Sequence, residues 1–146
     1  MTKTLPTGSY LIRSKVDNKP VGSGPDKLGL TQVVVGVDGG YDFKRLDDGK
    51  YKVFLSGGKP TQVVEPGYIF AVDDADAPAE RWVITAQPKE GPNVYTIQTE
   101  DKKVGWVTPG EDEYWQIAAK PLKYVNGRFP PSELYIIIPD SDKRDE

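Results

Sequence analysis

A pattern of aromatic and aliphatic residues occurs three times along the chain in the same order, and it constrains the fold more than any other feature. Each occurrence opens with a turn, a tyrosine, one residue and an aliphatic residue, as in Gly8-Ser-Tyr10-Leu-Ile12, Gly49-Lys-Tyr51-Lys-Val53 and Pro92-Asn-Val-Tyr95-Thr-Ile97. A second aromatic pair closes each unit, in Tyr41-Asp-Phe43, Trp82-Val-Ile84 and Tyr135-Ile-Ile137. Residues two apart in a strand point to the same face, so each pair predicts a strand with one buried side.

Any single pair of this kind is typical of an ordinary strand core, but two pairs recurring in order predict threefold pseudo-symmetry. The 15 glycines and 13 prolines spread along the chain also favour many short strands. We therefore expect an all-β fold, a β-trefoil in which a six-stranded barrel is capped by hairpins. The 146 residues predict one domain with repeats at 8–47, 48–90 and 91–139 and a short polar tail at 140–146.

The same patterns assign strands, loops and core. Strands are expected at 9–14, 32–37, 41–46, 51–55, 68–72, 81–86, 94–99, 105–107, 115–119 and 134–138, and the most prominent loops at 21–30, 56–60, 73–80 and 124–131. The predicted core consists of the repeated aromatic and aliphatic residues Tyr10, Phe43, Tyr51, Trp82, Ile84, Tyr95, Ile97, Tyr135 and Ile137.

Composition removes most routes to catalysis. The chain has no cysteine and no histidine, so it lacks thiol nucleophiles, disulfides and the side chain that most often acts as a general base or metal ligand. A carboxylate pair is still chemically possible, but no Asp or Glu pair has a recognisable acid/base context. We expect a protein that is not an enzyme and that binds no metal and no cofactor.

The charge and hydropathy patterns exclude further classes of partner. The formal net charge is −3 without a long basic cluster, which argues against a nucleic-acid surface. No apolar run is long enough to cross a bilayer, and the N-terminus lacks the apolar core of a secretory signal. The sequence predicts a monomer in the cytoplasm.

Two other motifs give little support for a calcium site or for a ricin-type lectin. The acidic stretches Asp73-Asp-Ala-Asp-Ala-Pro-Ala-Glu80 and Glu111-Asp-Glu113 offer oxygen ligands for calcium, but they lack the spacing of an EF-hand loop and fit solvated turns better. The Gln-x-Trp signature of ricin-type lectins is absent, and the nearest string, Tyr114-Trp115-Gln116, has the reverse order.

The loop at 21–30 presents a lysine. It reads Gly22-Ser-Gly-Pro25-Asp26-Lys27-Leu28-Gly29 and runs into the β-branched stretch Thr31-Gln-Val-Val-Val35. A trypsin-like protease has an aspartate at the base of its specificity pocket, which pairs with a lysine ammonium. Pro25 restricts the backbone two residues before Lys27, and the following strand anchors the far end, so Lys27–Leu28 is the expected scissile bond. Loop lysines are mostly just solvated, and Gly22, Gly24 and Gly29 favour flexibility, so the pattern by itself leaves a plain connector open.

Several longer segments point to a family. Gly8-Ser-Tyr-Leu-Ile12, Arg81-Trp-Val-Ile-Thr85, Tyr95-Thr-Ile-Gln-Thr99, Gly105-Trp-Val107 and Pro130-Pro-Ser-Glu-Leu-Tyr-Ile-Ile138 resemble the fungal β-trefoil serine protease inhibitors of mushrooms, the cospin and cnispin group. The resemblance covers most of the chain and implies a trypsin-like serine protease as partner. It also implies a basic P1 residue on the loop between the second and third strands. Lys27 lies on that loop, framed by Pro25, Asp26, Leu28 and Gly29.

Other sites and functions stay open at this point. Arg128, Lys103 and Lys59 are further basic candidates for P1. A mycocypin-like inhibitor of cysteine proteases would act on papain-type enzymes or, through an exposed Asn126 or Asn18, on asparaginyl endopeptidases. A β-trefoil lectin is the alternative from a different class. The sequence does not separate regulation of internal proteases from defence against animals that eat the tissue.

Overall fold

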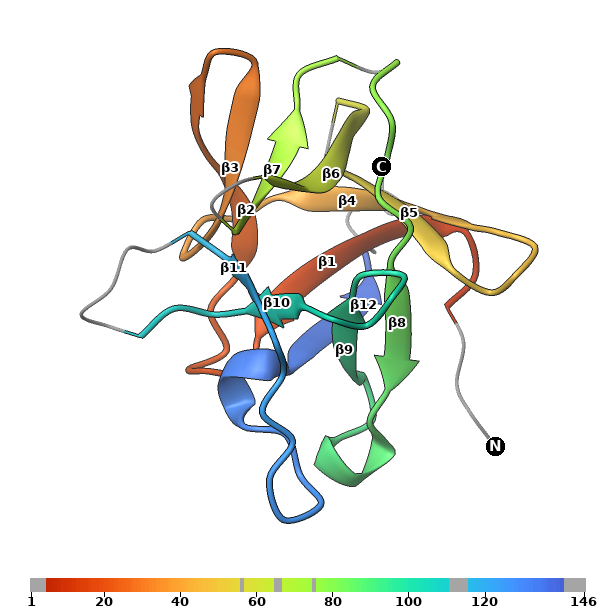
Figure 1. Ribbon diagram of the computed structural model, residues 1–146, viewed down its shortest axis with the longest axis vertical. Coiled ribbons are helices and arrows are strands. Elements are labelled where there is room, and N and C mark those ends of the chain that lie inside the picture. Colours follow the sequence, from red (N-terminus) through yellow and green to blue (C-terminus); the bar gives the residue numbers. More distant parts are fainter. Residues whose placement is uncertain (1–4, 56, 65–66, 75, 111–115, 141–146) are drawn as a thin grey trace.

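The computed structural model describes residues 5–55, 57–64, 67–74, 76–110 and 116–140, and these form an all-β fold (Figure 1). The strands are β1 (Gly8–Ser14), β2 (Val21–Lys27), β3 (Leu30–Val35), β4 (Gly40–Arg45), β5 (Tyr51–Leu55), β6 (Lys59–Val64), β7 (Tyr68–Val72), β8 (Val83–Ala86), β9 (Val94–Gln98), β10 (Gly105–Val107), β11 (Ala118–Lys120) and β12 (Tyr135–Pro139). Two short 3-10 helices, η1 (Pro88–Glu90) and η2 (Pro131–Glu133), lie between strands. In the described part of the chain, no helix is long and apolar enough to cross a membrane.

The strands form one antiparallel sheet that closes into a barrel of nine strands. The circuit runs β1-β4-β5-β6-β7-β11-β10-β9-β12 and returns to β1, with the pairing of Ala118 and Tyr68 completing the β11–β7 junction. Three strands stand outside this ring: β8 pairs with β9, and β3 and β2 branch from β7. Each ring strand is thereby paired on both sides in the described part of the chain, which protects its edges.

The predicted β-trefoil with a six-stranded barrel is wrong. Such a barrel would continue from β5 directly to β8, but Tyr51 and Trp82 meet only in an isolated bridge, because the regular ladder of β8 begins at Val83 and is directed to β9. The ring closes instead through β6, β7, β11 and β10. The three repeats therefore contribute unequally: β1 and β4 come from the first, β5 to β7 from the second, and β9 to β12 from the third.

The strand assignment differs from the prediction in two places that affect the functional site. The segment expected to be a loop at 21–30 contains strand β2, and strand β6 was not predicted at all. Pro25 and Pro60 obscured both strands in the sequence, since proline removes a donor from a strand ladder. Trp115, in the strand expected at 115–119, lies outside the described residues, as does the tail beyond residue 140.

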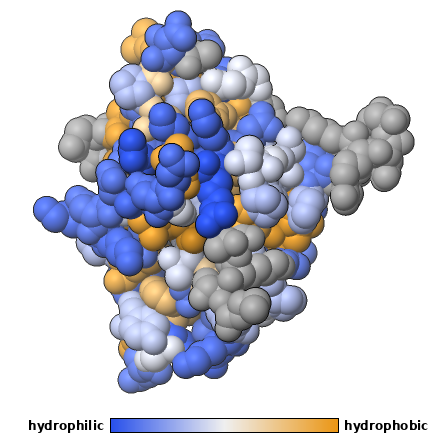
Figure 2. Space-filling view, turned by 90° about the vertical axis from the view of Figure 1, so that its right-hand side faces the viewer, coloured by the Kyte–Doolittle hydropathy of each residue, from blue (hydrophilic) through white to orange (hydrophobic). Residues whose placement is uncertain are grey.

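The core contains the repeated aromatic and aliphatic residues. All nine predicted core residues except the half-buried Ile84 are buried, and Tyr41, Trp106 and Ile117 join them. Trp106 is the centre of the aromatic packing, with ring centroids 5.6 Å from Trp82, 6.1 Å from Tyr135 and 6.5 Å from Tyr41 in edge-to-face geometry. Figure 2 shows that hydrophilic side chains cover most of one outer face, with hydrophobic areas between them.

A buried threonine hydroxyl connects the β5–β6 region to Trp82. The Thr61 hydroxyl donates to the Val53 carbonyl at 2.7 Å and accepts from the Trp82 indole Nε1 at 2.9 Å. Both contacts are buried, so the loss of the hydroxyl leaves a donor and an acceptor without these partners inside the protein.

Thr61→Val keeps the side-chain shape and removes both contacts. We expect it to lower the free energy of unfolding by about 2 kcal/mol, because a buried polar group without a partner retains its desolvation penalty. Urea unfolding followed by tryptophan fluorescence measures the change. The same substitution at half-buried Thr85 on β8 is the control and should change stability far less. Equal effects at the two positions would contradict this account.

Candidate functional site

The β2–β3 hairpin projects from the barrel at one end of the molecule (Figure 1). Lys27, the last residue of β2, pairs with Leu30, the first residue of β3, so the connection is the two-residue turn Leu28-Gly29. Both turn residues have positive φ, 57° at Leu28 and 79° at Gly29. These angles are those of a type I′ turn, whose twist matches that of the flanking strands.

Strand β2 is irregular where the sequence has Gly24-Pro25. The pairing shifts between Ser23, opposite Val33, and Asp26, opposite Thr31, which inserts one extra residue into β2 as a β-bulge. The strand is last in the sheet order, where a residue without N–H is tolerated at a bulge. Gly22 does not provide flexibility: a Cβ there would overlap the carbonyl oxygen of Val37, so glycine permits a close backbone contact.

Strand β3 holds the base of the hairpin against the barrel. It pairs with β2 along one edge and, through Leu30, Thr31 and Gln32, with β7 along the other. Val33 and Val34 are fully buried. The backbone N–H of Asp73 donates to the Gly29 carbonyl at 2.7 Å, which attaches the turn itself to the end of β7. The hairpin is thus supported almost to its tip.

A polar cluster braces the same hairpin from the side. The Lys59 ammonium at the start of β6 lies 3.7 Å from a carboxylate oxygen of Asp26 and 4.0 Å from one of Asp73. It also donates to the Thr31 hydroxyl at 3.2 Å, and that hydroxyl donates to Asp26 at 3.2 Å. Lys59, one of the basic P1 candidates, is therefore engaged in supporting the residue next to Lys27.

The tip leaves two side chains in solvent. Lys27 is exposed, and within the described ranges its side chain makes no hydrogen bond or ion pair. Leu28 is 93% exposed, the highest value among the exposed large hydrophobic residues. The structure brings Pro25, Asp26, Lys27, Leu28 and Gly29 together as the tip and outer strand of one hairpin.

The remaining candidates lie elsewhere. Asn126 and Arg128 belong to a second hairpin at the opposite end of the molecule (Figure 1), where Val125 and Arg128 pair across Asn126-Gly127. The Arg128 guanidinium binds both carboxylate oxygens of Glu90, at 3.0 and 3.1 Å, which holds the pKa of Glu90 below its usual range. Lys103 is exposed in the turn before β10, and the carbonyl of Asn18 accepts from Arg13 at 3.2 Å.

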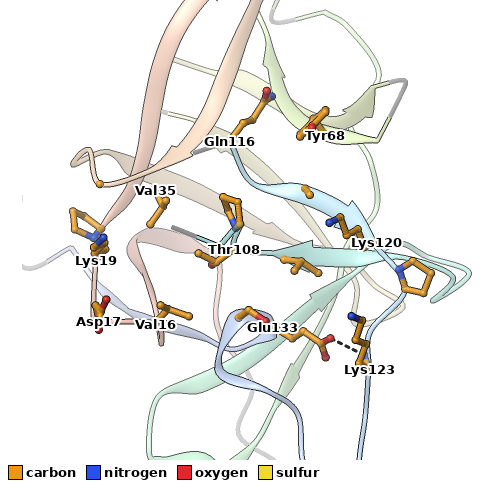
Figure 3. A pocket seen from close by; sticks show the side chains of 18 residues that line it. Val16, Asp17, Lys19, Val35, Tyr68, Thr108, Gln116, Lys120, Lys123 and Glu133 are labelled. Atoms are coloured by element: carbon orange, nitrogen blue, oxygen red, sulfur yellow. Dashed lines mark hydrogen bonds between the residues drawn. The ribbon is translucent and has the colours of Figure 1, made fainter. Parts of the chain in front are cut away.

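A cavity of about 780 Å³ lies on another face, between the β1–β2 connection, β10–β11 and η2 (Figure 3). Lys19 stands on one side of it and Lys120 and Lys123 on the other. Glu133 lines it although it is only 2% exposed: one carboxylate oxygen accepts from the Lys123 backbone N–H at 2.6 Å, and the other has no hydrogen-bond partner among the described residues. Burial raises the pKa of Glu133.

No group of three or more acidic side chains in the described ranges could hold a metal ion. Asp73 of the acidic stretch at 73–80 instead lies beside Lys59. The second acidic stretch, at 111–113, lies outside the described residues together with Tyr114 and Trp115.

Lys59→Met removes the ammonium from the cluster beside the hairpin. We expect faster amide exchange at the hairpin tip, at Lys27 and Leu30, because the side chains of Asp26 and Thr31 lose their shared partner. The free energy of unfolding should fall by less than about 1 kcal/mol, since the ion pairs are partly exposed. Hydrogen exchange measured by NMR tests this, with exposed Lys44→Met on β4 as control. Unchanged exchange at the tip would contradict the bracing role.

Glu133→Gln tests the buried carboxyl. Its raised pKa means that ionisation opposes folding, so the penalty is absent at low pH and develops as the pH rises above the unfolded-state value. Glutamine can still accept from the Lys123 N–H without carrying a charge. We expect a higher melting temperature for the variant at pH 7 and a difference that closes near pH 3. A variant with a lower melting temperature than the parent at pH 7 would contradict the view that ionisation of Glu133 opposes folding.

Comparison with solved structures finds chains of the same fold, and one of them is a protease inhibitor. A proteinase inhibitor from Coprinopsis cinerea is 25% identical, with a TM-score of 0.79 over 93% of this chain and 99% of the other. A salivary protein from Culex quinquefasciatus is 15% identical, with a TM-score of 0.70 over 94% and 96% of the two chains. SeviL bound to asialo-GM1 saccharide is 16% identical, with a TM-score of 0.64 over 92% and 98%. The last two likenesses concern the fold alone.

The sequence itself matches a family. No curated protein sequence is a significant match to the chain, but the family model described as peptidase inhibitor I66 matches residues 3–139. The predictions of a protease inhibitor and of a protein that is not an enzyme are thereby confirmed, and a protease is the partner that this match implies. With nearly its whole length matched, the chain belongs to the peptidase inhibitor I66 family.

Proposed function

We propose that the protein is a reversible, substrate-like inhibitor of trypsin-type serine proteases and that Lys27 enters the S1 pocket. The observation that carries the proposal is an exposed lysine without an ion pair among the described residues, at the tip of a hairpin that is held by backbone and side-chain contacts. In the complex, the Lys27 ammonium pairs with the aspartate at the base of S1.

The hairpin gives this lysine a low ordering cost on binding. Strand β3 is paired on both sides, and the Asp73 N–H holds the Gly29 carbonyl, so little conformational freedom is left to lose. Protease–inhibitor interfaces of standard size bury about 1,600 Å² in total, so the barrel surface around the hairpin also takes part.

The same pairing accounts for reversibility if the Lys27–Leu28 bond is cut. The new ends would still be held by the β2–β3 ladder on one side and by the β3–β7 ladder on the other. Ends kept in place favour re-formation of the peptide bond over release. A flexible loop would separate after cleavage and behave as a substrate.

The other basic candidates are less suited to S1. Lys59 is shared by Asp26 and Asp73, and Arg128 is bound by both oxygens of Glu90. Insertion of either side chain would first break these contacts. Lys103 is exposed, and it lies in the turn between β9 and β10 rather than on the projecting hairpin.

Lys27→Gln removes the positive charge and leaves the hairpin backbone unchanged. We expect the variant to lose trypsin inhibition, by at least about 100-fold in Ki, because the S1 aspartate would be left without its partner. Lys27→Arg should retain inhibition, and exposed Lys44→Gln on β4 is the matched control. Ki values from progress curves and melting temperatures are measured for each variant.

Full inhibition by Lys27→Gln would overturn the assignment of P1. Lys103→Gln and Arg128→Gln, assayed in parallel, would then show which basic residue enters S1. A wild-type protein that inhibits papain or an asparaginyl endopeptidase and leaves trypsin active would overturn the trypsin-type target while leaving the family unchanged.

A further inference from the structure

Leu28 has an unusual backbone conformation for its residue type. In the described part of the chain, the non-glycine residues with positive φ are Asp17, Asn18, Leu28, Lys102 and Asn126. Asp and Asn tolerate this left-handed region because their short polar side chains bond locally, whereas a bulky aliphatic residue there is an outlier. Leu28 is the single hydrophobic residue in this set.

The second hairpin provides an internal comparison. Its turn residues Asn126 and Gly127 have φ values of 53° and 79°, nearly those of Leu28 and Gly29, 57° and 79°. Asn-Gly is the preferred pair for this turn. The chain therefore uses the favourable sequence in one hairpin and replaces its asparagine by leucine in the hairpin that presents Lys27.

The leucine side chain contributes almost no apolar burial to the stability of the free protein. The side chain is 93% exposed, so it buries almost no apolar surface. The space on the side-chain side of the turn is open: a Cβ added at neighbouring Gly29 would meet no atom within 4 Å. An unfavourable backbone conformation and an exposed aliphatic side chain coincide at one residue, and the described residues bury almost none of that side chain.

We propose that Leu28 is a specificity-determining contact whose side chain packs on an apolar surface of the protease beside the pocket that receives Lys27. The inference rests on the proposed function and adds the chemistry of the second subsite, which must be apolar because Leu28 offers no hydrogen-bonding group. Complex formation would bury the side chain that the free protein leaves in water. The rigid turn fixes its direction relative to Lys27, so one backbone geometry positions both side chains.

The decisive variant is Leu28→Asn, which keeps the left-handed turn and removes the aliphatic side chain. We expect Ki for trypsin to rise about tenfold or more, because the apolar contact is lost. We also expect the melting temperature to rise, because asparagine suits this backbone conformation. Leu28→Met keeps an apolar side chain of similar volume and should restore inhibition to near the parent value.

Lys102→Asn is the matched control, since Lys102 has a φ of 61° and is exposed in a turn away from the hairpin. This change should also raise the melting temperature but should leave Ki unchanged. Both variants relieve backbone strain, but only Leu28→Asn removes the apolar contact. Weaker inhibition by Leu28→Asn together with normal inhibition by Lys102→Asn would therefore show that the lost contact causes the rise in Ki.

Three results would overturn the inference. The first is a Leu28→Asn variant that inhibits as well as the parent while Lys27→Gln does not, which would leave the proposed function intact. The second is a lower melting temperature for Leu28→Asn, which would mean that the leucine stabilises the free protein. The third is a parent protein that leaves trypsin active and inhibits chymotrypsin, with this inhibition lost in Leu28→Asn and kept in Lys27→Gln. Leu28 itself would then occupy S1, and the proposed function would fail as well.

Discussion

Strand β7 divides one of its edges between two partners, and both the closed barrel and the projecting hairpin depend on that division. Its other edge pairs with β6 from Tyr68 to Ala71. Tyr68, at its beginning, pairs with Ala118 of β11 and closes the ring, while Phe70, Ala71 and Val72 pair with β3. The Asp73 N–H then continues this contact to the turn at Gly29. Phe70, Ala71, Val72 and Asp73 thus join the barrel to the hairpin that carries Lys27.

The sequence pattern located the strands better than their partners. Alternating aromatic and aliphatic residues are a local signal of a half-buried strand, and Tyr10, Tyr51, Tyr95 and Tyr135 are buried as that signal predicts. Pairing depends on contacts between distant segments, which a repeat does not record. A six-stranded barrel would need a continuous ladder between the strands of Tyr51 and Trp82. These residues meet only in a single bridge, and the observed barrel has nine strands.

At the candidate site, too, the sequence did not record contacts between distant segments. The lysine in the glycine-rich stretch was visible in the sequence, whereas the stiffness of its surroundings was not. Glycine and proline usually indicate a loop, yet Gly22 allows a close backbone contact and Pro25 occupies a bulge in an outer strand. The bracing residues Lys59 and Asp73 lie 32 and 46 positions beyond Lys27 and come together with it only through β3, β6 and β7. Neither had a sequence signal that connected it to the hairpin.

The bulge at Gly24-Pro25 has a consequence for how the protein behaves at high concentration. Strand β2 is last in the sheet order, and a regular outer strand offers a row of N–H and C=O groups to which another chain can add. Pro25 has no N–H, and the extra residue breaks the spacing of the row between Ser23 and Asp26. The projecting hairpin therefore exposes its tip without offering a regular strand edge to which a second chain could add.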